Sequence, residues 1–221
     1  MTFITLDIET VGTSRKDVVD YIAKNIKHPA THKKAETIAK WYQEEAPAAI
    51  EEAVSRTGLD GAFGQVVCVG LQFDDADPEA VFGLDEKDLL LRLNEKLDFI
   101  PRSMHSASTL IGHNVLDFDI RFLWQRYIVN GVRPHPIINT SVNAKAWDNK
   151  VFDTMTQFAG FGKRISLDKL CLALGIPSPK CDMDGSMVSK YVADGRLNDV
   201  VEYCLQDIVA TSACYKRMTF A

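Results

Sequence analysis

Five side chains in three separated segments have the types and spacing of a catalytic centre. Asp7 and Glu9 stand two residues apart in the apolar stretch FITLDIETVG, so a β-strand there would place both carboxylates on one face. Asp119 lies in GHNVLDFDIRFL, and Tyr203 and Asp207 lie four apart in VEYCLQDIVAT, a spacing that shares one face of a helix. Because carboxylates this close repel each other, we expect positive charge between them.

The oxygen ligands indicate which cation would supply this positive charge. Several carboxylate oxygens around one point favour hard cations such as Mg²⁺ or Mn²⁺. Two such ions, roughly 3.5–4 Å apart, can hold the attacking and leaving oxygens of an in-line phosphoryl displacement. The residues therefore predict a two-ion site that works on a phosphate ester.

The elements that must position these groups follow from the periodicity of the sequence. Apolar and β-branched runs predict strands, and apolar residues at helical spacing predict the helices between and after them. This order predicts a three-layer α/β fold with a mixed central sheet. The predicted strands are 2–8, 65–73, 80–84, 108–114 and 151–155, and the predicted helices are 85–100, 117–131, 166–175, 186–195 and 197–217.

The motifs D-x-E-T at 7–10, N-x-x-x-F-D at 114–119 and Y-x-x-x-D at 203–207 occur in this order. Together they resemble the three Exo motifs of the DEDD 3′–5′ exonucleases. The tyrosine (DEDDy) branch is indicated, because Tyr203 stands four residues before the last aspartate and Glu202 occupies the place of the histidine in the other branch. The chain is most similar to stand-alone bacterial proteins related to the proofreading domain of family B DNA polymerases.

This resemblance implies a ribonuclease H-like fold with two Mg²⁺ or Mn²⁺ ions. Asp7 would bridge both ions, Glu9 and Asp207 would hold the ion on the side of the nucleophile, and Asp119 would hold the other. Tyr203 would orient the attacking water. All five residues would thus be catalytic, and the four carboxylates would be the metal ligands.

The resemblance also implies a substrate and its contacts. The expected reaction removes nucleoside 5′-monophosphates from single-stranded 3′ ends, with DNA favoured over RNA. The backbone around Thr10 and the side chain of Asn114 would contact the terminal nucleotide, and Phe118 would pack beside its base or sugar. His113 could contact substrate or make a structural hydrogen bond, and the sequence leaves both readings open.

Two alternatives have different functions. A nucleic-acid-binding module that has lost turnover could keep the same fold. D-x-E-T also resembles the D-x-D-x-T that opens haloacid dehalogenase-like phosphatases, but that family needs a late pair of adjacent acids. Here the adjacent acids at 44–45, 51–52 and 74–75 come too early. The exonuclease is therefore the favoured reading.

Several acidic residues need a structural interpretation beside the catalytic one. Asp117 competes with Asp119, which is preferred because it directly follows the aromatic residue of the motif. Asp153, Asp182 and Asp184 precede helical sequence and are predicted to be helix caps.

Residues 15–60 are predicted to form a helical insertion after the first strand, within one domain spanning 1–221. Trp41 is expected to pack rather than to stack on a base. A local group of basic residues is either a solvated face or a guide for single-stranded substrate. Its members are Lys24, Lys27, Lys33, Lys34 and Lys40, with His28 and His32 among them.

Composition limits the location and the partners. The five cysteines form no C-x-x-C pair, and no leader or membrane-spanning stretch is visible, so a cytoplasmic protein without membrane contact is expected. The net charge of −5 predicts few phosphate contacts. The sequence identifies no replication or repair partner and no oligomeric state.

Overall fold

The computed structural model describes residues 2–145, 147–178 and 183–221, so Asp182 and Cys181 lie outside the described residues. Its centre is a mixed sheet in the order β3-β2-β1-β4-β5. β1 is antiparallel to β2 and parallel to β4, β2 is antiparallel to β3, and β4 is parallel to β5. The strands are β1 (Thr2–Val11), β2 (Gln65–Phe73), β3 (Glu79–Phe82), β4 (Ser108–Gly112) and β5 (Val151–Asp153).

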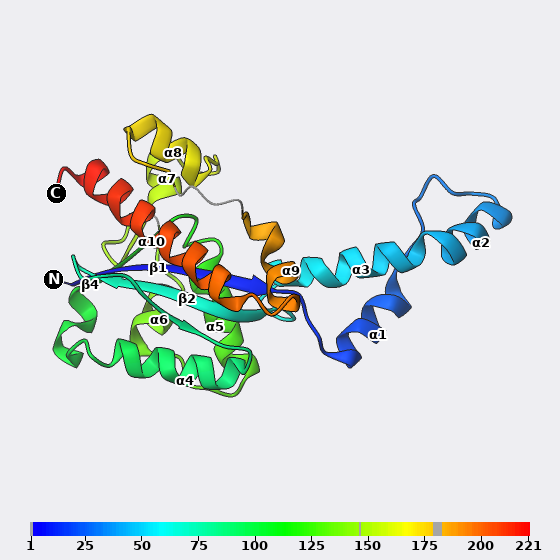
Figure 1. Ribbon diagram of the computed structural model, residues 1–221, viewed down its shortest axis with the longest axis horizontal. Coiled ribbons are helices and arrows are strands. Elements are labelled where there is room, and N and C mark those ends of the chain that lie inside the picture. The colour runs from blue at the N-terminus through cyan, green and yellow to red at the C-terminus, as the bar shows by residue number, and fades with distance from the viewer. Residues whose placement is uncertain (1, 146, 179–182) are drawn as a thin grey trace.

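The two faces of β1 have different neighbours. Ile4, Leu6 and Ile8 are buried in the main apolar core with residues of the helices on one side of the sheet. Because strand side chains alternate, Asp7 and Glu9 point to the opposite side, which the last helix covers (Figure 1). The first side carries α4 (Glu86–Leu97), α5 (Asp119–Val129) and α6 (Pro136–Ser141), and the second carries α7 (Thr154–Ala159), α8 (Leu167–Leu174) and α10 (Leu197–Thr219).

α10 packs closely on the sheet at Gly70 in β2, the residue that pairs with Asp7 in β1. A Cβ atom on Gly70 would lie 2.8 Å from the Sγ of Cys204 and 2.8 Å from Cγ1 of Ile208. Real Cβ atoms do not come this close to other atoms. Only glycine at this position therefore allows α10 to lie directly over the acidic face of β1.

Three helices between β1 and β2 form an arm that projects from the end of β1 (Figure 1). They are α1 (Lys16–Asn25), α2 (Ala35–Glu44) and α3 (Ala46–Arg56), and the short helix η1 (Thr57–Leu59) follows. The hydroxyl of Thr10 donates to the carbonyl of Gly58 at 2.6 Å, and the backbone N–H of Thr13 donates to Oγ1 of Thr57 at 2.7 Å. These contacts attach the base of the arm to the end of β1.

The outer part of the arm has a small aromatic core. Trp41 is only 5% exposed, and its ring packs edge-on against Tyr42 and His28 with centroid separations of 5.0 and 6.5 Å. The prediction that Trp41 packs is confirmed. That residues 1–221 make one domain with an insertion stays a prediction.

The structure differs from the predicted elements mainly at α6, η2 (Arg102–Ala107) and the split of 186–195 into η3 (Gly185–Met187) and α9 (Val188–Ala193). The sequence predicts a proline-bearing connection at 133–137 and no helix over the residues of α6. In the structure Pro136 occupies the first turn, and Nδ1 of His135 accepts from the backbone N–H of Ile137 at 3.2 Å. Proline is tolerated there because the first N–H groups of a helix need no intrahelical acceptor. None of the helices in the described ranges is both long and apolar enough to span a bilayer.

Candidate active site

The two carboxylates of β1 lie in a strongly acidic environment. Asp7 is half-buried and Glu9 is 6% exposed. Burial, followed by the charges of Asp119, Glu9 and Asp207, raises the pKa of Asp7 well above its usual value. Burial and the charge of Asp207 do the same to the pKa of Glu9. Residues from three separated segments thus act electrostatically on one another.

Asp119 occupies the first position of α5 and is 3% exposed. Its Oδ1 accepts a hydrogen bond from the backbone N–H of Ile8 at 3.1 Å, so its carboxylate lies against β1 between the positions of Asp7 and Glu9. Burial raises its pKa to about 7. Asp117 is exposed instead. Of the two candidates, Asp119 is therefore the one brought to the acidic face.

Tyr203 and Asp207 come from consecutive turns of α10 and are both half-buried. The Tyr203 hydroxyl hydrogen-bonds to the Asp207 carboxylate, while burial raises the pKa of Asp207 to about 6. Burial and the charge of Asp207 raise the pKa of Tyr203 far above its ordinary value. The tyrosine consequently keeps its proton and acts here as a donor.

The four carboxylates fit a site for hard divalent cations. None of them takes part in the ion pairs that the structure shows within its described ranges. Their mutual repulsion is instead visible in the raised pKa values of Asp7 and Glu9. A set of carboxylate oxygens without a protein cation is the donor set that Mg²⁺ and Mn²⁺ prefer.

Cys204 also belongs to this centre, although the sequence motifs do not include it. Its Sγ lies 3.5 Å from Oδ2 of Asp7, and ligand atoms of Asp7, Glu9 and Cys204 all lie within 4.8 Å of one another. A hydrogen bond with Cys68, followed by burial, raises the pKa of the Cys204 thiol well above its usual value, so it stays protonated and donates to Asp7. Its position three residues before Asp207, on the same helix face, was the available signal.

The turn after β4 places Asn114 beside the acidic face. Asn114 has a φ of 66°, and its Oδ1 is buried without a hydrogen-bond partner. Asp153 fixes this turn by accepting from the backbone N–H groups of Asn114 and Leu116 at 3.1 and 3.0 Å. It also caps α7 through the N–H groups of residues 155 and 156, so the predicted capping role is confirmed.

The remaining predicted contact residues lie nearby but already have protein partners. The hydroxyl of Thr10 bonds to the base of the arm. Phe118 is half-buried and packs against Phe122 at 5.4 Å between ring centroids. His113 uses both ring nitrogens, toward the Thr154 hydroxyl and the Ile165 carbonyl at 2.9 Å each. A structural hydrogen bond, one of the two readings left open for this histidine, is therefore present.

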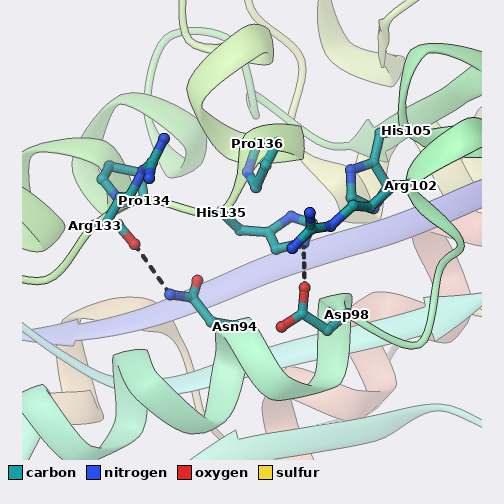
Figure 2. A pocket seen from close by; sticks show the side chains of 8 residues that line it. All are labelled: Asn94, Asp98, Arg102, His105, Arg133, Pro134, His135 and Pro136. Atoms are coloured by element: carbon teal, nitrogen blue, oxygen red, sulfur yellow. Dashed lines mark hydrogen bonds and ion pairs between the residues drawn. The ribbon is translucent and has the colours of Figure 1, made fainter.

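Figure 2 shows a separate pocket of about 380 Å³ between the end of α4 and the start of α6. The amide of Asn94 donates to the Arg133 carbonyl at 3.0 Å, and Nε2 of His135 lies 3.3 Å from Oδ1 of Asp98. These contacts join α4 to the segment before α6. The pocket contains none of the predicted site residues.

Comparison with known proteins identifies the fold and the family. The chain resembles the family B DNA polymerase of the hyperthermophilic archaeon Pyrobaculum calidifontis, with a TM-score of 0.55 and 14% sequence identity. The match covers 100% of this chain and 24% of the polymerase chain, so the chain spans about a quarter of that protein. At this identity the likeness concerns the fold, and it confirms the predicted ribonuclease H-like architecture. Comparison with curated proteins gives no significant match.

A family pattern matches residues 65–221 and is described as a predicted 3′–5′ exonuclease related to the exonuclease domain of PolB. The matched segment includes Asp119, Tyr203 and Asp207 and begins after Asp7 and Glu9. It starts at the first residue of β2, so β1 and the arm lie outside it. The chain thus belongs to the family of predicted 3′–5′ exonucleases related to the exonuclease domain of family B DNA polymerases.

Proposed function

We propose that the protein is a two-metal-ion exonuclease that shortens single-stranded nucleic acid from the 3′ end, DNA in preference to RNA, and releases nucleoside 5′-monophosphates. The observation that supports this most strongly is the pair of carboxylates on one face of β1, Asp7 and Glu9. Asp119 bonds to the N–H of Ile8 between them, and the charge of Asp207 acts on both. Such a centre costs stability unless cations bind there. The proposed reaction uses those cations.

Asp7, Glu9, Asp119 and Asp207 would hold two Mg²⁺ or Mn²⁺ ions. When bound, the ions would lower the pKa of the attacking water and neutralise charge on the leaving oxygen. Tyr203 keeps its proton and orients the water by a hydrogen bond. Asn114 offers a buried acceptor to the terminal nucleotide, and the backbone near Thr10 lines the same end of β1.

The test uses matched 5′-labelled single-stranded DNA and RNA oligomers with purified protein in Mg²⁺ and in Mn²⁺. We expect a ladder that shortens from the 3′ end, faster for DNA, and that disappears with chelator. Asp7→Ala and Asp207→Ala should abolish it while the circular dichroism spectrum is retained. Asp117→Ala is the matched control, since this aspartate is exposed, and it should leave cleavage unchanged.

The other readings give different products. Intact oligomers in both metals, together with measurable oligomer binding, would replace the proposal with a binding module that lacks turnover. Release of inorganic phosphate from a phosphomonoester would favour a phosphatase. Retained metal-dependent cleavage in Asp7→Ala would contradict the assigned role of that residue.

A further inference from the structure

We propose that Arg164 and Lys169 bind the phosphodiester next to the scissile one, on its 5′ side, and so set the path of the strand into the active site. The inference rests on the proposed exonuclease function and adds a site for the substrate backbone to it. It derives from a cavity of about 400 Å³ between the turn after β4 and the start of α8. Arg164, Ser166 and Lys169 line its outer side, and Asn114 lines the other.

The cavity lies beside the acidic centre. α8, which carries Lys169, packs on α10, because Leu170 and Cys171 share a buried cluster with Ala210 and Cys214. On the opposite wall, the turn that carries Asn114 follows Gly112, whose Cβ position would lie 2.9 Å from the carbonyl oxygen of Leu6, the neighbour of Asp7. The two walls of the cavity are thus attached to the two elements that carry Asp207 and Asp7.

The wall that holds the two cations is fixed in place. Nε2 of His113 donates to the carbonyl of Ile165 at 2.9 Å, which ties the segment before α8 to the turn after β4. Oγ of Ser166 caps α8 by accepting from the backbone N–H of Lys169 at 3.4 Å. The backbone that presents Arg164 and Lys169 is therefore anchored on both sides.

The side chains of Arg164 and Lys169 are available to bind an anion. Both residues are exposed, and neither belongs to an ion pair within the part of the chain that the structure describes. The protein has a net charge of −5, and the acidic centre lies beside the cavity. The negative charge of the protein therefore repels an incoming nucleic-acid strand. Two unpaired cations beside that centre offset this repulsion locally.

The position of the bound phosphate follows from the polarity of the substrate. The scissile phosphate must lie at the carboxylates, and in a strand cut one nucleotide from its 3′ end this is the last phosphate. Every other phosphate lies on the 5′ side. Cations that lie in the cavity beside the centre, rather than in it, therefore meet the next phosphate along the strand.

The experiment compares two substrates that differ in this phosphate. The 4-nitrophenyl ester of thymidine 5′-monophosphate has one phosphodiester, and a single-stranded deoxyoligonucleotide has many. For the double variant R164Q/K169Q we expect the ratio of kcat/KM for the oligomer to kcat/KM for the ester to fall about tenfold, because charge-assisted hydrogen bonds to a phosphate are lost. Lys163→Gln removes a charge beside the cavity but outside its lining, and it should leave the ratio unchanged.

A binding measurement tests the same contact without catalysis. With chelator present, oligomer affinity is measured against salt concentration for wild type, R164Q/K169Q and Lys163→Gln. Loss of one phosphate contact should reduce the slope of log affinity against log salt by about 0.7 in the double variant alone. Thermal unfolding checks that each variant is folded.

The inference is overturned if the double variant lowers kcat/KM equally for both substrates, which would place the cations at the scissile phosphate. It is also overturned if the ratio and the salt slope stay at their wild-type values, or if Lys163→Gln reduces both as much as the double variant does. Failure of the wild type to cleave either substrate would contradict the proposed function instead. The salt slopes would then still decide whether Arg164 and Lys169 contact phosphate.

Discussion

The Sγ of Cys204 on the last helix lies 3.5 Å from Oδ2 of Asp7 on the first strand, and the hydrogen bond between them lowers the pKa of that carboxyl. We expect Cys204→Ala to raise the proton affinity of Asp7 and so to raise the Mg²⁺ concentration for half-maximal cleavage several-fold. The size follows from one lost hydrogen bond to a charged group. Metal titrations of the cleavage rate near pH 7 measure it.

Cys204→Ser is the matched variant, because serine keeps a donor at the same position. It should stay closer to wild type than alanine does. Equal metal requirements in wild type and Cys204→Ala would contradict a role for the thiol.

Gly70 decides how closely α10 approaches the carboxylates. Gly70→Ala would place a Cβ atom 2.8 Å from Cys204 and Ile208, so α10 must move away, and with it Tyr203 and Asp207. We expect a loss of about 1–3 kcal/mol in the free energy of unfolding and a larger relative loss of cleavage. Urea unfolding and kcat/KM measure the two effects. Gly185→Ala, which meets no atom within 4 Å, should change neither.

The raised carboxyl pKa values make stability in chelator depend on pH. Asp119 and Asp207 have pKa values of about 7 and about 6 in the folded protein, against 3.8 ordinarily, so the folded state binds more protons between these limits. By linkage, their contribution to the free energy of unfolding is fully present below pH 4 and is lost as the pH rises through 6 and 7. Divalent cations should restore it.

Asp119→Asn removes the contribution of Asp119 to this pH dependence of stability. The asparagine amide oxygen can still accept the hydrogen bond from the N–H of Ile8. We expect the variant to gain stability relative to wild type between pH 5 and pH 8, by on the order of 3 kcal/mol. The free energies of unfolding of the variant and of wild type are measured by urea unfolding in chelator at pH 5 and at pH 8. A difference between variant and wild type that is independent of pH would rule out the raised pKa.

The tip of the arm provides a prediction about substrate length. Lys24, Lys27, Lys33 and Lys34 are exposed and belong to no ion pair within the described ranges, whereas Lys40 lies 3.7 Å from Glu44. If they guide the strand, replacing all four by glutamine should flatten the salt dependence of binding for a long single-stranded oligomer. A tetranucleotide held at the acidic centre should bind as before, because the arm projects away from the sheet (Figure 1). Unchanged slopes for the long oligomer would leave these lysines as a solvated surface.

The sequence was sufficient to predict those features that depend on local pattern and on the chemistry of neighbouring residues. Ile4, Leu6 and Ile8 alternate with polar residues, so the strand and the shared face of Asp7 and Glu9 were predictable, and β1 runs to Val11. Asp153 was predicted to be a cap because it directly precedes a helix, and it accepts from the first N–H groups of α7. Such features depend on neighbours a few residues away.

The contacts that sequence reasoning missed depend on distant residues. The Cys204–Asp7 contact spans 197 positions, and the helix spacing that places Cys204 on the face of Asp207 does not identify its partner in β1. The fit of Gly70 under α10 likewise exists only after the helix has packed on β2. The six residues of α6 are too few to show a helical period. Their proline indicates the end of a helix in the sequence, whereas in the structure it lies in the first turn, which His135 caps.

The arm begins after Val11 and ends before Gln65, and these two residues are partners in the β1–β2 ladder. The whole arm therefore connects β1 and β2 in the way that the loop of a β-hairpin connects its two strands. Doubling the length of such a connection costs only about 0.6 kcal/mol in chain entropy. Helices of other lengths or surface chemistry could therefore be exchanged between α1 and α3 without a change in strand register, provided that Thr57 and Gly58 keep their bonds to the end of β1. The position makes the arm an interchangeable module, whose helices can vary while the geometry of the acidic face is preserved.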